Sequence, residues 1–164
     1  MKSRIQYAVI LLSALLLGAC RQGDGPVAKP DANTEAELDD VKHDLQNVAR
    51  RDPSGPEDLR SDVTKYARRA TEAPAIDELS RRTASVIVGK TLDDQTAARL
   101  AHSLWTSIMA REISERQVEA LQNEVQSVLM SAGVAEPQAQ QVAAQVGVIQ
   151  KQVSNRPRRW YELF

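Results

Sequence analysis

The sequence predicts an all-α protein, a small helical bundle of about five or six amphipathic helices behind a leader and a flexible tether. Apolar residues recur at alternating spacings of three and four, which places them on one face of a helix. The chain is rich in Ala, Leu, Gln and Arg and poor in Gly and aromatic residues, and such side chains lose little entropy in a helix. With 164 residues, one folded domain is expected.

The helical domain is predicted to cover residues 34–155, which contain six apolar stripes. Proline or glycine separates the stripes, except between the fourth and the fifth, where the spacing of Ser114 and Gln117 suggests a new helix start. In chain order the stripes are Leu38, Val41, Leu45 and Val48; Leu59, Val63, Tyr66 and Ala70; Ile76, Leu79, Thr83 and Val86; Ala97, Ala101, Leu104 and Ile108; Val118, Leu121, Val125, Val128 and Ala132; and Ala139, Val142, Val146, Ile149 and Val153. Segments of this kind with short connections close a single bundle. Their regularity also suits coiled-coil packing and self-association.

Three helix starts are predicted from side chains that can cap a helix. Thr34–Glu37 and Ser114–Gln117 have the spacing of a capping box, and Thr91–Asp94 is a third candidate. The second of these favours a break near Ile113. One continuous helix over residues 92–132 is the alternative.

Residues 1–19 have the three parts of a secretory signal peptide. Two cations give a positive start, Tyr7–Leu17 is apolar almost throughout, and small residues end the segment. A transmembrane helix needs about 20 apolar residues, and Gly23–Pro26 interrupts the run too early for one. Cleavage by the general signal peptidase after Ala19 is disfavoured, because the bulky Leu17 lies where that enzyme accepts a small side chain.

The last four residues of this stretch, Leu17–Cys20, resemble the lipobox of bacterial lipoproteins. The resemblance implies that the leader is cut between Ala19 and Cys20 and that the Cys20 thiol carries a diacylglyceryl group. It also implies that the new amino group is acylated, with palmitate as a typical chain, and two or more chains anchor a protein stably to a membrane. Arg21 lies where Asp would favour inner-membrane retention. The resemblance therefore implies an outer-membrane lipoprotein that faces the periplasm, with the inner membrane as the alternative.

The polar segment that follows, residues 20–33, is predicted to be the lipidated N-terminus and a flexible tether. A coil of this length spans about 20 Å on average. Such a tether would hold the helical domain a short way above the lipid headgroups.

The segment Pro137–Val153 carries a single charge, Lys151, and its polar face consists of glutamine. A face without charge loses less solvation free energy than a charged one when a partner covers it. Gln138, Gln141 and Gln145 are therefore candidate partner-binding residues. A solvated glutamine face without a partner is the alternative.

The C-terminal tail, residues 156–164, holds half of the aromatic residues of the chain beside several arginines. Arginine next to Trp and Tyr is typical of protein interfaces and of membrane-surface belts. The alternative is that the tail folds back over the open end of the bundle. The candidate contacts of the tail are Arg158, Arg159, Trp160, Tyr161 and Phe164.

Arginine doublets occur at 50–51, 68–69, 81–82 and 158–159. Guanidinium groups bind phosphate through paired hydrogen bonds, so the doublets are candidates for contacts with lipid phosphates or other anions. For the first two doublets, a position in the last turn of a helix, where cations are favoured, is the preferred explanation.

Neither a catalytic site nor a metal or cofactor site is predicted. His43 lies among three aspartates of residues 39–44, but no second histidine is near in sequence to complete a metal site, and His102 beside Ser103 has no acid at helical spacing to orient it. Cys20 is the only cysteine, which excludes an intramolecular disulfide. The net charge of −1 lacks the basic surplus of a nucleic-acid-binding protein.

One segment of the helical domain, Ile113–Gln117, resembles the Leu-Thr-x-x-Gln motif of small helical periplasmic stress chaperones, and Thr91–Gln95 has similar letters. This resemblance implies a chaperone as the second functional hypothesis, and an enzyme is the third. The first hypothesis is a lipid-anchored protein-interaction or scaffold module of the cell envelope, which binds an envelope protein or a second copy of itself.

Overall fold

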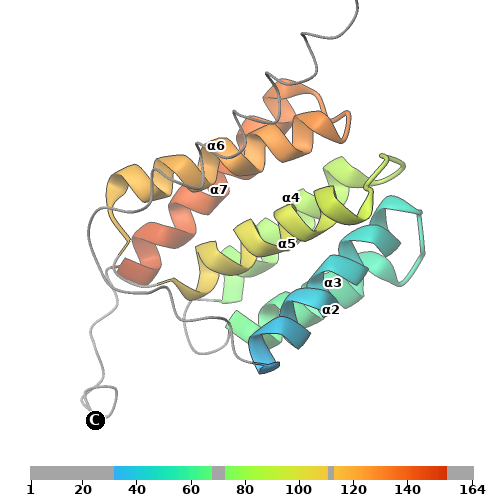
Figure 1. Cartoon of the computed structure of the whole chain (residues 1–164), viewed down its shortest axis with the longest axis horizontal. Helices are drawn as coiled ribbons and strands as arrows, with labels where there is room; N and C mark the ends of the chain where they lie inside the picture. The colour runs from blue at the N-terminus through green and yellow to red at the C-terminus, as the bar shows by residue number, and fades with distance from the viewer. Residues whose placement is uncertain (1–31, 68–72, 111–112, 155–164) are drawn as a thin grey trace, which may run out of the picture. The chain divides into compact units, whose positions relative to one another are not determined.

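In the computed structural model, residues 32–67, 73–110 and 113–154 are described, and they form six helices and no strand (Figure 1). The helices are α2 (Ala32–Ala49), α3 (Gly55–Ala67), α4 (Ala73–Ile87), α5 (Asp94–Met109), α6 (Glu115–Ser131) and α7 (Glu136–Ser154). The predicted all-α bundle is confirmed. None of the described helices has both the length and the apolar character that a membrane span requires.

Several predicted features lie outside the described residues. These are the leader with Ala19 and Cys20, most of the tether, the doublet at 68–69, and the tail 156–164 with its arginines and aromatic residues.

The six helices pack in two layers (Figure 1). One layer contains α2, α5 and α6, and α3, α4 and α7 lie behind it. Within each layer the neighbours are in contact, and the pairs α2–α3 and α6–α7 join the two layers. Each of these two pairs is connected by a short link, as expected for helices that pack as neighbours.

The hydrophobic core lies between the layers and contains most residues of the predicted stripes. The largest completely buried apolar side chains are Leu45, Leu59, Ile76, Leu79, Ile87, Leu100, Leu129 and Ile149. Ile87, Leu100 and Leu129 are not part of the predicted stripes. Each helix contacts at least two others, so its buried face is wider than the two-position seam of a coiled coil.

The predicted break between α5 and α6 is confirmed, and a continuous helix over residues 92–132 is excluded. Ser114 is the N-cap residue of α6. Its hydroxyl oxygen accepts the Gln117 backbone N–H at 3.3 Å, and the Gln117 side-chain oxygen accepts the Ser114 backbone N–H at 2.8 Å. This is the reciprocal pairing of a capping box.

The other two predicted helix starts are wrong in detail. The N-cap residue of α5 is Asp93, whose carboxylate accepts the Thr96 backbone N–H at 2.7 Å, so the predicted Thr91–Asp94 cap is displaced by a stronger capping residue. Helix α2 begins at Ala32, two residues before the predicted start, and Thr34–Glu37 therefore lies inside the helix.

Candidate functional site

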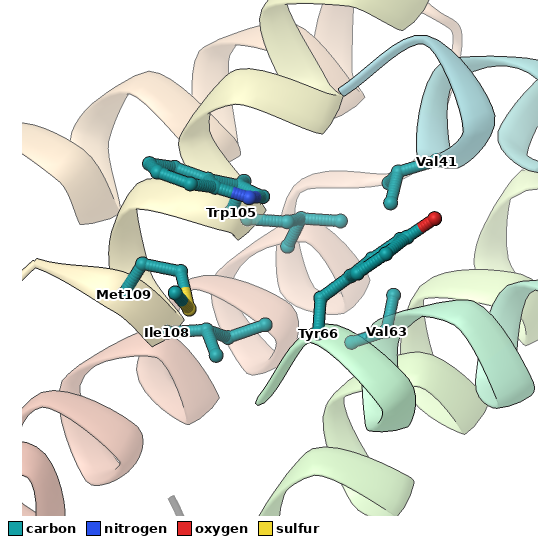
Figure 2. Close-up of a pocket in the computed structure, with 7 residues that line it drawn as sticks. Val41, Val63, Tyr66, Trp105, Ile108 and Met109 are labelled. Atoms are coloured by element: carbon teal, nitrogen blue, oxygen red, sulfur yellow. The ribbon is translucent and has the colours of Figure 1, made fainter. Parts of the chain in front are cut away.

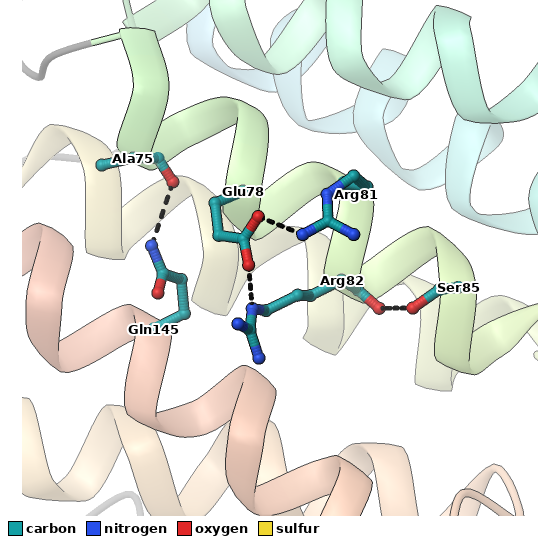
Figure 3. Close-up of polar contacts among 6 residues, drawn as sticks. All are labelled: Ala75, Glu78, Arg81, Arg82, Ser85 and Gln145. Atoms are coloured by element: carbon teal, nitrogen blue, oxygen red, sulfur yellow. Dashed lines mark hydrogen bonds and ion pairs between the residues drawn. The ribbon is translucent and has the colours of Figure 1, made fainter.

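The three candidate glutamines of α7 differ in their surroundings. Gln138 and Gln141 are exposed. Gln145 is half-buried, and its side-chain amide donates a hydrogen bond to the Ala75 carbonyl oxygen of α4 at 3.3 Å (Figure 3). Two of the three residues therefore lie on the free surface of the domain, whereas the third joins α7 to α4.

A further glutamine of α7, Gln150, has a structural role that the sequence did not indicate. It is 1% exposed, and its amide donates to the backbone carbonyl oxygens of Ser107 and Ala110 at the end of α5. Together with Gln145, it ties α7 to the middle of the bundle.

The outward side of α7, called the α7 face below, has very little charge. Val148 is 45% exposed there, and the charged residues are Lys151 and Glu136, which accepts a hydrogen bond from Gln140 at 3.3 Å. The α7 face consists of Glu136, Gln138, Gln140, Gln141, Ala144, Val148 and Lys151.

The arginine doublet of α4 is already paired with a carboxylate. Glu78 accepts hydrogen bonds from both Arg81 and Arg82, which lie three and four residues further along the same helix (Figure 3). These hydrogen bonds lower the pKa of the Glu78 carboxyl group. A doublet held in this way is less available to an external anion.

The doublet Arg50–Arg51 lies beyond the last residue of α2, not in its last turn as predicted. The helix ends in a Schellman motif, in which the Arg51 N–H donates to the Val48 carbonyl and the Asp52 N–H donates to the Asn47 carbonyl, both at 3.0 Å. Arg51 has a φ of 65°, and it is the one non-glycine residue with positive φ in the described ranges. This conformation costs about 1 kcal/mol for a residue with a Cβ atom.

The guanidinium groups of this doublet are not needed to cap α2. The Arg50 N–H donates to the Gln46 carbonyl at 2.9 Å, and the Gly89 N–H donates to the Ala49 carbonyl at 3.0 Å. With the two bonds of the Schellman motif, all four carbonyl groups of residues 46–49 accept backbone hydrogen bonds. The two side chains are therefore free for other contacts.

Both arginines are lining residues of an open cavity of about 360 Å³, called the basic cavity below, between the α2–α3 and α4–α5 connections. Its cations, Arg50, Arg51 and Lys90, form no ion pair within the described part of the chain. The complete lining is Gln46, Ala49, Arg50, Arg51, Gly89, Lys90, Thr91 and Leu92.

The acidic residues next to the basic cavity have other partners. Asp52 accepts hydrogen bonds from the backbone and hydroxyl of Ser54, at 3.0 and 3.2 Å. Asp93 caps α5, and Asp94 forms an ion pair with Lys42 at 3.4 Å. Among the described residues, none of these three carboxylates forms an ion pair with a cation of the cavity.

A second charged group lies between α2 and α3 and is acidic. Asp44 is only 8% exposed, and one of its carboxylate oxygens has no hydrogen-bond partner among the residues that the structure describes. Burial, together with the charges of Asp62, Asp58 and Asp40, raises the pKa of Asp44 to about 7. The Tyr66 hydroxyl donates a hydrogen bond to Asp40 at 2.6 Å. Burial is the main cause that raises the pKa of Tyr66, and this hydrogen bond is the second.

A small apolar pocket lies beside this acidic group (Figure 2). The rings of Tyr66 and Trp105, which are the only aromatic residues of the predicted domain 34–155, lie at its two sides. Its volume is about 10 Å³, about the space of one water molecule. The Trp105 indole N–H donates to Glu37 at 3.2 Å. The other lining residues are Val41, Val63, Leu104, Ile108 and Met109.

Both histidines lie on the surface, His43 on α2 and His102 on α5. In the residues that the structure describes, no three His, Cys, Asp or Glu side chains converge closely enough to hold a metal ion.

No protein-family model, curated protein or solved structure matches this chain. The segment Ile113–Gln117, which resembles a chaperone motif, contains the Ser114–Gln117 capping box of α6. Its serine and glutamine therefore have a role in starting a helix.

Proposed function

We propose that this protein is a lipid-anchored lipoprotein of the bacterial outer membrane whose helical domain binds another envelope protein on the periplasmic side. The observation that carries the proposal is the α7 face, which is exposed and almost uncharged.

The physical argument rests on desolvation. Covering Gln141, Ala144 and Val148 with a partner removes apolar surface from water, which contributes roughly 25 cal/mol per Å² of apolar area. Neutral amides lose less solvation than charged groups, and they form hydrogen bonds across an interface. An exposed face of this composition therefore favours association.

The α7 face is also held in place before any partner arrives. The hydrogen bonds of Gln145 to α4 and of Gln150 to α5 fix the helix on the bundle from two sides. A preorganised surface loses less conformational entropy on binding than a mobile one. The two inward glutamines thus support the function of the outward ones.

In-cell photocrosslinking tests the interaction. A photoreactive residue replaces Gln141 on the α7 face, Trp160 in the tail, or Ser61, an exposed residue of α3 that serves as the control. We expect Gln141 and Trp160 to yield the same dominant envelope protein, and Ser61 to yield none. Comparable yields of many unrelated proteins would favour a chaperone, and a product with twice the mass of the chain would indicate self-association. A yield no higher than that of the Ser61 control would refute the proposal.

The membrane anchor has its own test. Labelled palmitate should appear on the wild-type protein and disappear in Cys20→Ala, and the wild type should fractionate with the outer membrane. The Arg21→Asp variant should move to the inner-membrane fraction. Label that survives in Cys20→Ala would contradict the anchor.

A further inference from the structure

The basic cavity is independent of the α7 face, since no residue of α7 lines it. Three cationic residues line it, and they form no ion pair with a carboxylate of the described residues. Like charges that share a cavity repel one another, and an anion among them removes this repulsion. Thr91, which also lines the cavity, carries a hydroxyl that can donate a hydrogen bond without adding charge.

Two features of the backbone place the Arg51 side chain at this cavity. The first is the left-handed conformation of Arg51, at a helix end where glycine is the usual residue. The second is Gly89, which has a φ of +72° and no side chain. A Cβ atom at position 89 would lie 2.8 Å from a guanidinium nitrogen of Arg51. Position 51 is thus an arginine although glycine would adopt this backbone conformation with less strain, and position 89 is a glycine, which leaves space for the Arg51 guanidinium group.

We propose that the basic cavity binds the phosphate group of an anionic ligand, which is either the phosphodiester of a lipid headgroup or the phosphate of a soluble compound. Arg50 and Arg51 supply planar donors that match the oxygens of phosphate in pairs. Lys90 adds a third positive charge, and Thr91 donates to a remaining oxygen. A cavity of about 360 Å³ is large enough for a phosphate group with part of the molecule attached to it.

Arginine side-chain NMR tests the proposal on the full processed chain in dodecyl maltoside micelles. Inorganic phosphate is titrated against chloride at constant ionic strength, and the Nε–H signals of Arg50 and Arg51 are followed. We expect saturable shifts of these two signals. Arg51→Gln should weaken the affinity about tenfold, which is typical for the loss of a charged hydrogen-bonding partner.

Two further variants separate binding from folding and from overall charge. Arg51→Gly removes the guanidinium group but suits the left-handed backbone, so it should remain folded and still lose the affinity. Arg81→Gln removes the same charge from the doublet that is paired with Glu78, and it should bind phosphate as the wild type does.

The source of the phosphate is identified by a second probe. Dihexanoyl-phosphatidylglycerol and dihexanoyl-phosphatidylcholine are titrated into the same micelles. Phosphatidylglycerol that binds at least ten times more tightly than inorganic phosphate, and more tightly than phosphatidylcholine, would assign the cavity to an anionic lipid headgroup. Binding no tighter than that of inorganic phosphate would assign it to a soluble compound. Absence of saturation with every probe, or equal losses in Arg51→Gln and Arg81→Gln, would overturn the proposal.

Discussion

Helix α2 takes part in two groups of like charges, one along its length and one at its end. The acidic group consists of Asp40, Asp44, Asp58 and Asp62, and the basic group consists of Arg50, Arg51 and Lys90. In the acidic group the Asp44 carboxyl is buried, so desolvation and repulsion by the other aspartates raise its pKa and favour its protonated form. In the basic group the cations surround an open cavity and remain hydrated.

The difference follows from the dielectric environment. Two unit charges about 4 Å apart interact by about 1 kcal/mol in water and by about 4 kcal/mol near a protein surface of lower effective dielectric. Burial of Asp44 therefore couples the acidic group to the free energy of unfolding. The basic group contributes little to folding and stays available for a ligand. Four predictions test this contrast.

The largest expected effect belongs to Asp44. Its pKa is about 7 in the folded chain, against the ordinary 3.8 in the unfolded chain. Between these values the folded state binds a proton that the unfolded state does not, so the stability is present at low pH and is lost as pH rises through 7. We expect the wild type to lose about 2–3 kcal/mol of unfolding free energy between pH 5 and pH 8.5.

In Asp44→Asn the side chain stays neutral, so the unfolding free energy, measured by urea unfolding at each pH, should lose much of its pH dependence. Glu119→Gln, a change at an exposed acid of α6, serves as the control and should keep the pH dependence of the wild type. The same pH dependence in Asp44→Asn and in the wild type would show that the titration of Asp44 does not control the stability.

The next effect concerns Gly89, which lines the basic cavity. Gly89→Ala places a Cβ atom at a φ of +72° and against the Arg51 guanidinium, and we expect a loss of about 1–2 kcal/mol in urea unfolding. Gly133→Ala is the matched control, since Gly133 has a φ of +86° and no atom of the described residues lies within 4 Å of the added Cβ atom. Both changes strain the backbone, but only Gly89→Ala should also weaken phosphate binding. Equal phosphate affinities in the two variants would show that Gly89 is not needed for phosphate binding at the basic cavity.

The helices of this chain were predictable because their signals are local. The period of apolar residues and the Ser114–Gln117 capping box are contained within one or two helical turns, and both are confirmed. The start of α5 was misassigned because Thr91 and Asp93 are both acceptable N-cap residues, and only the chain geometry selects between them.

The candidate sites were harder to predict because they depend on contacts between distant helices. Gln145 and Gln141 have the same side chain and lie one turn apart, yet only Gln145 meets a carbonyl oxygen of α4. The charge repulsion of Asp44 by Asp58 and Asp62 acts between residues more than a dozen positions apart in the sequence. The left-handed conformation of Arg51 had no sequence signal, because glycine or asparagine is the residue that normally marks such a position.

A smaller effect of opposite sign is expected when the strain at Arg51 is removed. Arg51→Gly should raise the unfolding free energy by about 0.5–1 kcal/mol, because glycine adopts a positive φ without a steric penalty. Arg50→Gly provides the comparison, since Arg50 has no positive φ and glycine there only adds freedom to the unfolded chain. Thermal unfolding should therefore shift upward for the first variant and downward for the second. A downward shift in both would mean that the Arg51 side chain stabilises the fold more than its backbone strain destabilises it.

The smallest effect is expected at the paired doublet of α4. Arg81→Gln leaves Glu78 with its second partner, Arg82, and the Arg81 side chain of the lost ion pair is exposed to water. Exposed pairs of this kind contribute little, so thermal unfolding should not change measurably. Phosphate affinity should not change either, although the variant loses the same unit of charge as Arg51→Gln. If Arg81→Gln weakened phosphate binding as much as Arg51→Gln, the net charge of the chain would explain the binding, and the contrast between a paired and an unpaired doublet would fail.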